Sequence, residues 1–153
     1  MNLFEPLPLA DPPARGAGTG LPIPGAISEK TSMLLIVDDD EAVRAFACVA
    51  SRRLGYQVIE ATNGREALQQ LAAHPGKIDL VLTDINMPVM DGLQLVKTLK
   101  SSAVVPAIAV MSGRMDQVSR ISLQSDGVSE FLSKPFGVSS LQQVLLRAGA
   151  ARG

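Results

Sequence analysis

Four short apolar runs in this chain each end at a polar side chain that could take part in chemistry. If the runs are parallel strands that alternate with helices, their carboxyl ends share one edge of a sheet, where ligands bind beside the point at which strand order reverses. We therefore expect these polar side chains to converge at that edge. They are Asp38 and Asp39 after residues 34–37, Asp84 after residues 80–82, Ser112 after residues 107–111, and Lys134 after residues 131–133.

The types of these side chains indicate phosphoryl chemistry assisted by a metal ion. Neighbouring carboxylates repel one another and raise one another's pKa values, so at neutral pH the group requires a cation or protons. A hard divalent ion such as Mg²⁺ binds through one or two carboxylates together with phosphate oxygens and water. Asp84, alone at the end of its run, could act as a nucleophile and form an aspartyl phosphate. Lys134 could supply a positive charge, and Ser112 a hydroxyl donor, for the phosphoryl oxygens.

Strand-like and helical patterns alternate from residue 33 onward and predict the scaffold that positions this site. Apolar residues recur at helical spacing between the strand-like runs, and glycine or proline stands where the helices should end. Five such units imply an α/β fold with one open, doubly wound, five-stranded parallel sheet flanked by five helices. The predicted strands are residues 34–37, 57–61, 80–82, 107–111 and 131–133, and the predicted helices are residues 43–54, 64–74, 93–99, 115–126 and 141–148.

The two ends of the chain are expected to lie outside the folded domain of residues 33–148. Residues 1–32 contain six of the ten prolines and several glycines, which do not support the regular hydrogen bonding of a packed core. We predict a disordered tail there, with docking of its leucines on a partner as the alternative. Met33 directly precedes the first strand and could be the true start. Residues 149–153 are predicted to form a short C-terminal tail.

Charge and cysteine content exclude several classes of protein. The chain has 14 Lys and Arg residues against 15 Asp and Glu residues, so no bulk charge draws it to nucleic acid or to an anionic membrane. One cysteine excludes an internal disulfide framework, and no apolar stretch reaches the roughly 18–20 residues of a membrane span. The N-terminus also lacks the pattern of a secretory signal. We therefore expect a cytoplasmic protein.

From residue 33 to about residue 148 the chain resembles the receiver domain of bacterial response regulators, the phosphorylated proteins of two-component signal transduction. The segments that carry the resemblance are L-L-I-V-D-D-D-E, L-V-L-T-D-I-N-M-P-V-M-D-G, V-M-S-G and F-L-S-K-P-F, in the family's order and at its separations. Each segment alone would be a weak signal, and together they are highly specific. The resemblance implies a flavodoxin-like fold.

The resemblance also implies a role for each matching residue. Two departures from the family pattern concern switching: Gly113 stands where alanine is more usual, and Phe131 lacks the hydroxyl of the more familiar tyrosine. The implied roles are phospho-acceptor for Asp84, metal ligands for Asp38, Asp39, Asp84 and the carbonyl of Asn86, catalytic lysine for Lys134, switch hydroxyl for Ser112, and switch aromatic for Phe131.

Four other residues have side chains that could take part in chemistry but are interpreted as structural. Asp40 and Glu41 open a helix, where acidic residues usually serve the cap and the helix dipole. His74 lies in a Pro-Gly loop and is interpreted as a solvated histidine. Cys48 is interpreted as a small hydrophobe in its helix, with a redox sensor as the less favoured alternative.

The first predicted helix has apolar residues on two sides. One side is expected to face the sheet, and the other is more apolar than solvent contact requires. Two explanations remain open for the second side: a docked helix of a phosphodonor, which the resemblance implies, or packing within the fold. The expected sheet-facing residues are Val43, Phe46, Ala47, Ala50 and Leu54, and the other side holds Ala45, Cys48 and Val49 between Arg44 and Arg52.

We therefore expect a stand-alone receiver, because the sequence ends at Gly153 without a DNA-binding or enzymatic output domain. It would accept a phosphoryl group on Asp84, with Mg²⁺, from a histidine kinase or histidine phosphotransfer protein and signal to a downstream protein. Direct nucleic-acid binding and membrane insertion are not expected. The protein is also not expected to be an enzyme, because it would promote only its own phosphorylation and dephosphorylation. A phosphate sink without output is the alternative. A phosphohydrolase is less favoured, because phosphate-loop motifs and the second aspartate of a D-x-D motif are absent.

Overall fold

The computed structural model describes residues 31–152, which form five strands and five helices in alternation. Residues 1–30, most of the predicted N-terminal tail, lie outside the described residues. Within the described part, no helix has the length and apolar composition needed to cross a bilayer. The elements are β1 (Met33–Val37), α1 (Glu41–Arg53), β2 (Gln57–Ala61), α2 (Gly64–Ala73), β3 (Leu80–Asp84), α3 (Gly92–Lys100), β4 (Ala107–Ser112), α4 (Gln117–Ser125), β5 (Glu130–Ser133) and α5 (Val138–Arg152).

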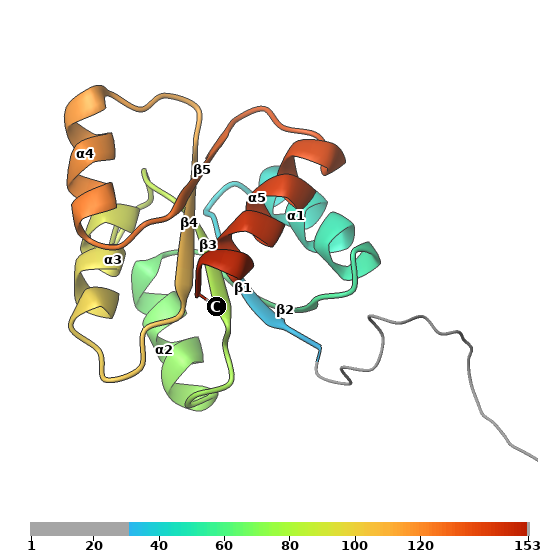
Figure 1. Ribbon diagram of the computed structural model, residues 1–153, viewed down its shortest axis with the longest axis horizontal. Helices are drawn as coiled ribbons and strands as arrows, with labels where there is room; N and C mark the ends of the chain where they lie inside the picture. Colours follow the sequence, from blue (N-terminus) through green and yellow to red (C-terminus); the bar gives the residue numbers. More distant parts are fainter. Residues whose placement is uncertain (1–30, 153) are drawn as a thin grey trace, which may run out of the picture. The chain divides into compact units, whose positions relative to one another are not determined.

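The five strands form one parallel sheet in the order β2-β1-β3-β4-β5 (Figure 1). The chain passes from β1 to β2 on one side and then returns to β3 on the other, so the direction of winding reverses between β1 and β3. Ligands of open parallel sheets bind at the carboxyl ends of strands beside such a reversal. The observed sheet confirms the predicted fold class and places the ends of β1 and β3 side by side.

Two layers of helices cover the sheet because successive side chains of a strand point to opposite faces. On β1, Leu34 and Ile36 belong to the core formed with α1 and α5, whereas Leu35 and Val37 belong to the core beneath α2, α3 and α4. Figure 1 shows α1 and α5 on one side of the sheet and the other three helices on the opposite side. A strand that is buried on both faces explains the unbroken apolar run in the sequence.

Acidic side chains begin two of the helices that follow the site strands. Asp40 caps α1 by accepting hydrogen bonds from the backbone N–H groups of Ala42 (2.9 Å) and Val43 (3.2 Å). Asp91 caps α3 and forms a capping box with Gln94. The structure thus confirms that Asp40 serves as a helix cap, and both caps limit the length of the loops that carry the site residues.

The orientation of α1 differs from the prediction. Cys48, expected on the outer side, is 2% exposed and packs in the core with α5, while Phe46, expected to face the sheet, is 42% exposed. Val49 is exposed as predicted. The reason is that α1 packs against both the sheet and α5, so its buried stripe is turned toward α5. Burial, with a smaller contribution from the charge of Glu60, raises the pKa of the Cys48 thiol to about 11, in agreement with an inert side chain.

The last helix is longer than predicted. Helix α5 continues to Arg152, so residues 149–152, predicted as part of a C-terminal tail, are helical. Ala148 is fully buried, whereas Gly149 and Ala150 are exposed. The apolar pattern marked the last buried position among residues 138–150, and the helix continues beyond that position.

Candidate functional site

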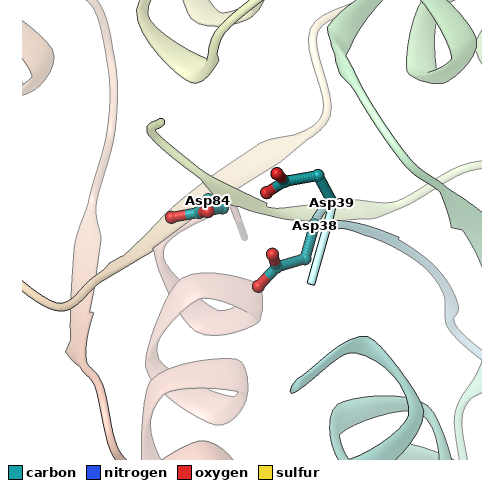
Figure 2. A group of neighbouring side chains, drawn as sticks. All are labelled: Asp38, Asp39 and Asp84. Carbon is teal, nitrogen blue, oxygen red and sulfur yellow. The ribbon is translucent and has the colours of Figure 1, made fainter. Parts of the chain in front are cut away.

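Three carboxylates meet at the edge of the sheet where the winding reverses. Asp84 is the last residue of β3, and Asp38 and Asp39 directly follow β1, its neighbour in the sheet. Each carboxylate has an oxygen within 4.8 Å of an oxygen of the other two. Figure 2 shows the carboxylates of Asp38 and Asp39 pointing toward the side on which Asp84 lies. The structure thus brings together the three acidic residues that the sequence predicted to converge.

Asp38 is fully buried and is held by hydrogen bonds at both its main chain and its side chain. Its backbone N–H donates to the carbonyl oxygen of Ala61 on β2 (3.1 Å), and its carbonyl oxygen accepts from Nη1 of Arg44 (2.8 Å). Its Oδ1 accepts from the backbone N–H of Asp40 (2.9 Å), and its Oδ2 accepts from Nζ of Lys134 (2.8 Å). These contacts fix the direction of its carboxylate before any ligand arrives.

Asp84 is buried beside Lys134, which bridges it to Asp38. Nζ of Lys134 lies 3.3 Å from Oδ2 of Asp84, and the backbone N–H of Ile85 donates to Oδ1 (2.8 Å). Burial and the charge of Asp38 raise the pKa of Asp84, while Lys134 acts in the opposite direction. Burial disfavours the charge on Lys134, but its hydrogen bond to Asp38 and the charge of Asp84 outweigh burial and raise the pKa of the lysine.

The donor set of this site fits a hard divalent cation. Three carboxylates face one ammonium group, so these four side chains together keep a net negative charge that a cation would compensate. The grouped ligand atoms are carboxylate oxygens, which Mg²⁺ prefers, and Asp39 is exposed, so an ion can enter with part of its water shell. Asn86 is exposed in the loop between β3 and α3. Its role as a ligand stays a prediction.

Ser112 lies at the same edge of the sheet, and its hydroxyl is engaged in its own turn. In the register of β3 and β4, Asp84 pairs with Met111, so Ser112 stands one residue nearer the carboxyl edge. Its Oγ donates to the carbonyl oxygen of Arg114 (2.7 Å) and accepts from the Arg114 backbone N–H (3.2 Å). Turning this hydroxyl toward a group on Asp84 therefore requires its hydrogen bond to the Arg114 carbonyl oxygen to break.

Phe131 lies outside the acidic group, on the edge strand β5. Its half-buried ring packs against the core beneath α2, α3 and α4, and its backbone position pairs with Val110 of β4. The guanidinium carbon of Arg120, on α4, lies 4.4 Å from the ring centroid. Such a cation–π contact contributes roughly 0.5–2 kcal/mol. The ring thus connects α4 to β5.

The loop after Asp84 is tightly built. The backbone N–H of Gly92 donates to the carbonyl oxygen of Ile85 (2.7 Å), which folds the start of α3 back against the end of β3. Val89, in the same loop, has a φ of 70°, which is unfavourable for a β-branched residue and costs about 1–3 kcal/mol. Strain of this kind persists only where surrounding contacts fix the backbone. Here the neighbouring Met90 donates its N–H to the carbonyl oxygen of Pro88 and accepts at its carbonyl oxygen from the N–H of Gly64.

Substitution Gly92→Ala should disrupt this loop and destabilise the protein. A Cβ at this position would overlap the carbonyl oxygen of Asp84 and lie 2.9 Å from Cα of Ile85, both of them backbone atoms. We expect the free energy of unfolding to fall by about 3 kcal/mol in urea titrations, because overpacking against backbone costs more than alanine gains as a helix former. The control is Gly113→Ala, where the nearest atom, Cβ of Lys134, is 4.0 Å away. Equal stability of the two variants would contradict the account.

Sequence reasoning missed three residues that shape the site. Arg44 was assigned to the flank of an outer helical face, but it reaches the main chain of the acidic loop. Arg120 was not considered, and it lies over the ring of Phe131. Gly92 ends one of the segments that carry the family resemblance, and no role was assigned to it. The Asp-Gly pair was a visible signal for a tight turn, whereas the sequence carried no signal for the two arginine contacts.

Comparison with known proteins identifies the family. A sequence profile of the response regulator receiver domain matches residues 34–146. The chain is 35% identical over 121 residues to the KDP operon transcriptional regulatory protein KdpE of Escherichia coli (strain K12), an alignment that covers 77% of this chain and 52% of KdpE. It is also 35% identical over 135 residues to the sensor histidine kinase TmoS of Ectopseudomonas mendocina, covering 85% of this chain and 13% of TmoS.

A solved structure agrees with these relatives. The chemotaxis response regulator CheY4 of Vibrio cholerae matches with a TM-score of 0.70 and 28% identity, over 78% of this chain and 99% of that chain. The chain belongs to the response regulator receiver domain family. Receiver domains are signalling modules of two-component systems, in which aspartyl phosphate and Mg²⁺ at an acidic pocket are family features. The chain spans about half the length of KdpE and a smaller part of TmoS.

Proposed function

We propose that this chain accepts one phosphoryl group on Asp84, in a Mg²⁺-dependent reaction, from a histidine kinase or a histidine phosphotransfer protein. The observation that carries the proposal is the position of Asp84. Its buried carboxylate ends the central strand β3, belongs to the three-carboxylate group and forms an ion pair with Lys134. A buried nucleophilic carboxylate, an acidic cation site and a lysine at one edge of a sheet form an arrangement that suits few reactions other than phosphoryl transfer.

The chemistry assigned to Asp84 is displacement at phosphorus. A carboxylate oxygen attacks the phosphorus of a phosphohistidine, the P–N bond breaks, and its electron pair stays on the imidazole nitrogen, which takes a proton from solvent. A bound Mg²⁺ would supply positive charge to the phosphoryl oxygens. Asp38 and Asp39, with Asn86, would hold the ion. Lys134 already bridges Asp38 and Asp84 and would stabilise the charge that develops on the transferred group.

We propose that phosphorylation is transmitted through Ser112 and Phe131. The hydroxyl of Ser112 would leave the carbonyl of Arg114 and donate to a phosphoryl oxygen, which moves the β4–α4 loop. Space vacated near the loop would let the ring of Phe131 turn inward, and its contact with Arg120 would carry the change to α4. The exposed Val118 and Ile121 of α4, together with β5 and α5, would then present an altered face to a downstream protein.

We propose that the phosphodonor docks on a groove between α1 and the loop after β5. The groove has a volume of about 370 Å³ and opens beside Lys134. The rings of Phe46 and Phe136 meet within it at 5.9 Å between centroids. An apolar groove next to the reacting carboxylate suits a helix that carries a phosphohistidine. Its residues are Ala42, Val43, Phe46, Lys134, Pro135 and Phe136.

The experiment that tests the proposal is labelling with a small acyl phosphate, followed by intact-mass measurement. The wild-type protein should gain one phosphoryl group when Mg²⁺ is present, because the donor set needs a cation before a dianionic group can approach. A chelator should reduce the labelling to background. Stoichiometric labelling in excess chelator would contradict the role of the acidic group. A phosphate sink without output shares this chemistry and differs only in lacking the switch, which the Ser112 variants in the Discussion test.

A further inference from the structure

Arg44 connects the acidic loop to the edge of the sheet. Its Nη1 donates to the carbonyl oxygen of Asp38 (2.8 Å), and its Nε donates to Oε1 of Glu60 on β2 (3.1 Å). The Arg44 side chain is 15% exposed, whereas that of Glu60 is 44% exposed. One guanidinium group, anchored on an exposed carboxylate, therefore reaches inward to a main-chain carbonyl at the site.

This carbonyl belongs to the peptide group that joins the two acidic residues after β1. The N–H of Asp38 donates to Ala61, and its carboxylate accepts from Asp40 and Lys134. Arg44 then binds the polar group of Asp38 that these hydrogen bonds leave, the backbone carbonyl oxygen. The orientation of the Asp38–Asp39 peptide decides where the exposed carboxylate of Asp39 points. Arg44 contacts this peptide group directly. A guanidinium suits the position because its rigid, planar set of N–H donors can bond to two acceptors at once.

We propose that Arg44 is a positioning residue for the cation site: by holding the Asp38 carbonyl, it presents the Asp39 carboxylate to the metal. The inference rests on the proposed function, because it concerns the Mg²⁺ site of that function. It goes further by assigning metal affinity to a residue that offers the ion no ligand atom. Outer partners of metal ligands commonly change affinity 10–100-fold when they are removed.

Whether removal of Arg44 weakens or tightens the binding of a divalent cation distinguishes a positioning role from a purely electrostatic one. Arg44 carries a positive charge close to the acidic group, so as a charge alone it opposes cation binding, and its removal should tighten the binding of a divalent ion. As a positioning residue it favours binding, and its removal should weaken it. Added salt sharpens the contrast, because 0.5 M salt screens a charge effect between partly exposed groups and leaves a geometric effect in place.

The experiment is Mn²⁺ titration, followed by electron paramagnetic resonance, of the full chain and three variants at low and high salt. We expect Arg44→Met to weaken Mn²⁺ about tenfold at both salt concentrations. Arg44→Lys, which keeps the charge but cannot serve both acceptors, should be intermediate. The control is Arg52→Met, which removes a positive charge from the same helix that contacts Glu60 at 3.7 Å; it should stay within about twofold of wild type.

A second readout follows from the labelling reaction. In Arg44→Met the Mg²⁺ concentration for half-maximal labelling should rise about tenfold, while the rate at saturating Mg²⁺ should stay near the wild-type rate. Unchanged or tighter Mn²⁺ binding in Arg44→Met would overturn the inference, as would an Arg44→Lys protein with wild-type affinity at high salt, which decides the matter if the methionine variant does not fold. If the wild-type protein binds no Mn²⁺, the proposed function itself is wrong.

Discussion

Asp84→Asn is expected to take up no phosphoryl group and, at neutral pH, to resist urea better than the wild-type protein. The loss of labelling follows because an amide is a poor nucleophile for phosphorus. The gain in stability follows from the environment of Asp84: burial and the charge of Asp38 outweigh the attraction of Lys134, so the pKa of this carboxyl is raised. Ionising a carboxyl group whose pKa is raised by its surroundings costs the folded state free energy, and an amide at the same position avoids this cost.

The pH dependence of this difference has a definite sign. Because the folded protein binds the Asp84 proton more tightly than the unfolded chain does, the wild type loses stability as pH rises from the ordinary carboxyl value of about 3.9 through the raised value. The advantage of Asp84→Asn should therefore be largest at pH values above the raised pKa and should shrink toward pH 4. Urea titrations at several pH values, without divalent ions, measure it.

Asp126→Asn is the matched control of opposite sign. Hydrogen bonds from Lys97 and Lys100 lower the pKa of Asp126, so its charge favours the folded state, and the asparagine variant should be less stable than wild type at pH 7. The wild-type stability lost with Asp126→Asn should diminish as pH falls below the ordinary carboxyl value. A destabilised Asp84→Asn protein at pH 7, or one that still labels fully, would contradict the description of the site.

Ser112→Ala should separate phosphorylation from its structural response. The variant keeps the carboxylates and Lys134, so it should still gain one phosphoryl group. It lacks the hydroxyl that must leave Arg114 and donate to the phosphoryl oxygen, and a ligand shifts an equilibrium only by its differential interaction with the two states. Phosphorylation should change the hydrogen-exchange protection of residues 115–131 in the variant by less than about a fifth of the wild-type change. This corresponds to a loss of roughly 1 kcal/mol of coupling free energy between Asp84 and this region.

Ser112→Thr is the matched control, because it keeps a hydroxyl at the same position. It should restore most of the exchange response and label like the wild type. An alanine variant that responds as strongly as the wild type would remove Ser112 from the switch. A wild-type protein that labels fully without any change in exchange across α4 and β5 would favour the phosphate sink over the signaller.

The parts of the fold and site that could be predicted are those that a short local segment specifies, together with those that follow from the order of such segments in a parallel sheet. The run before Asp84 is apolar on both faces because β3 is buried on both faces, and its carboxylate marks the edge of the sheet. Lys134 could be added because parallel strands end at a common edge, although it is 96 residues from its partner Asp38. The convergence of the site thus followed from topology.

The parts that could not be predicted depend on contacts between segments. In α1, residues 45–50 are all apolar, so a helical period does not select the buried face, and packing against α5 decided it in favour of Cys48 over Phe46. The bond from Arg44 depends on a main-chain carbonyl, which has no signature in the side-chain pattern. The orientation of the Ser112 hydroxyl likewise depends on the course of the following turn.

The most direct test of the central claim is to locate the phosphoryl group. After labelling with a small acyl phosphate and Mg²⁺, reduction with borohydride converts a phosphorylated aspartate to homoserine, and peptide mass spectrometry then reads its position. We expect homoserine at position 84 alone, in an amount that matches the phosphoryl group gained by the intact protein. Homoserine at position 38 or 39, or a phosphoryl group that borohydride does not convert, would contradict the assignment of Asp84.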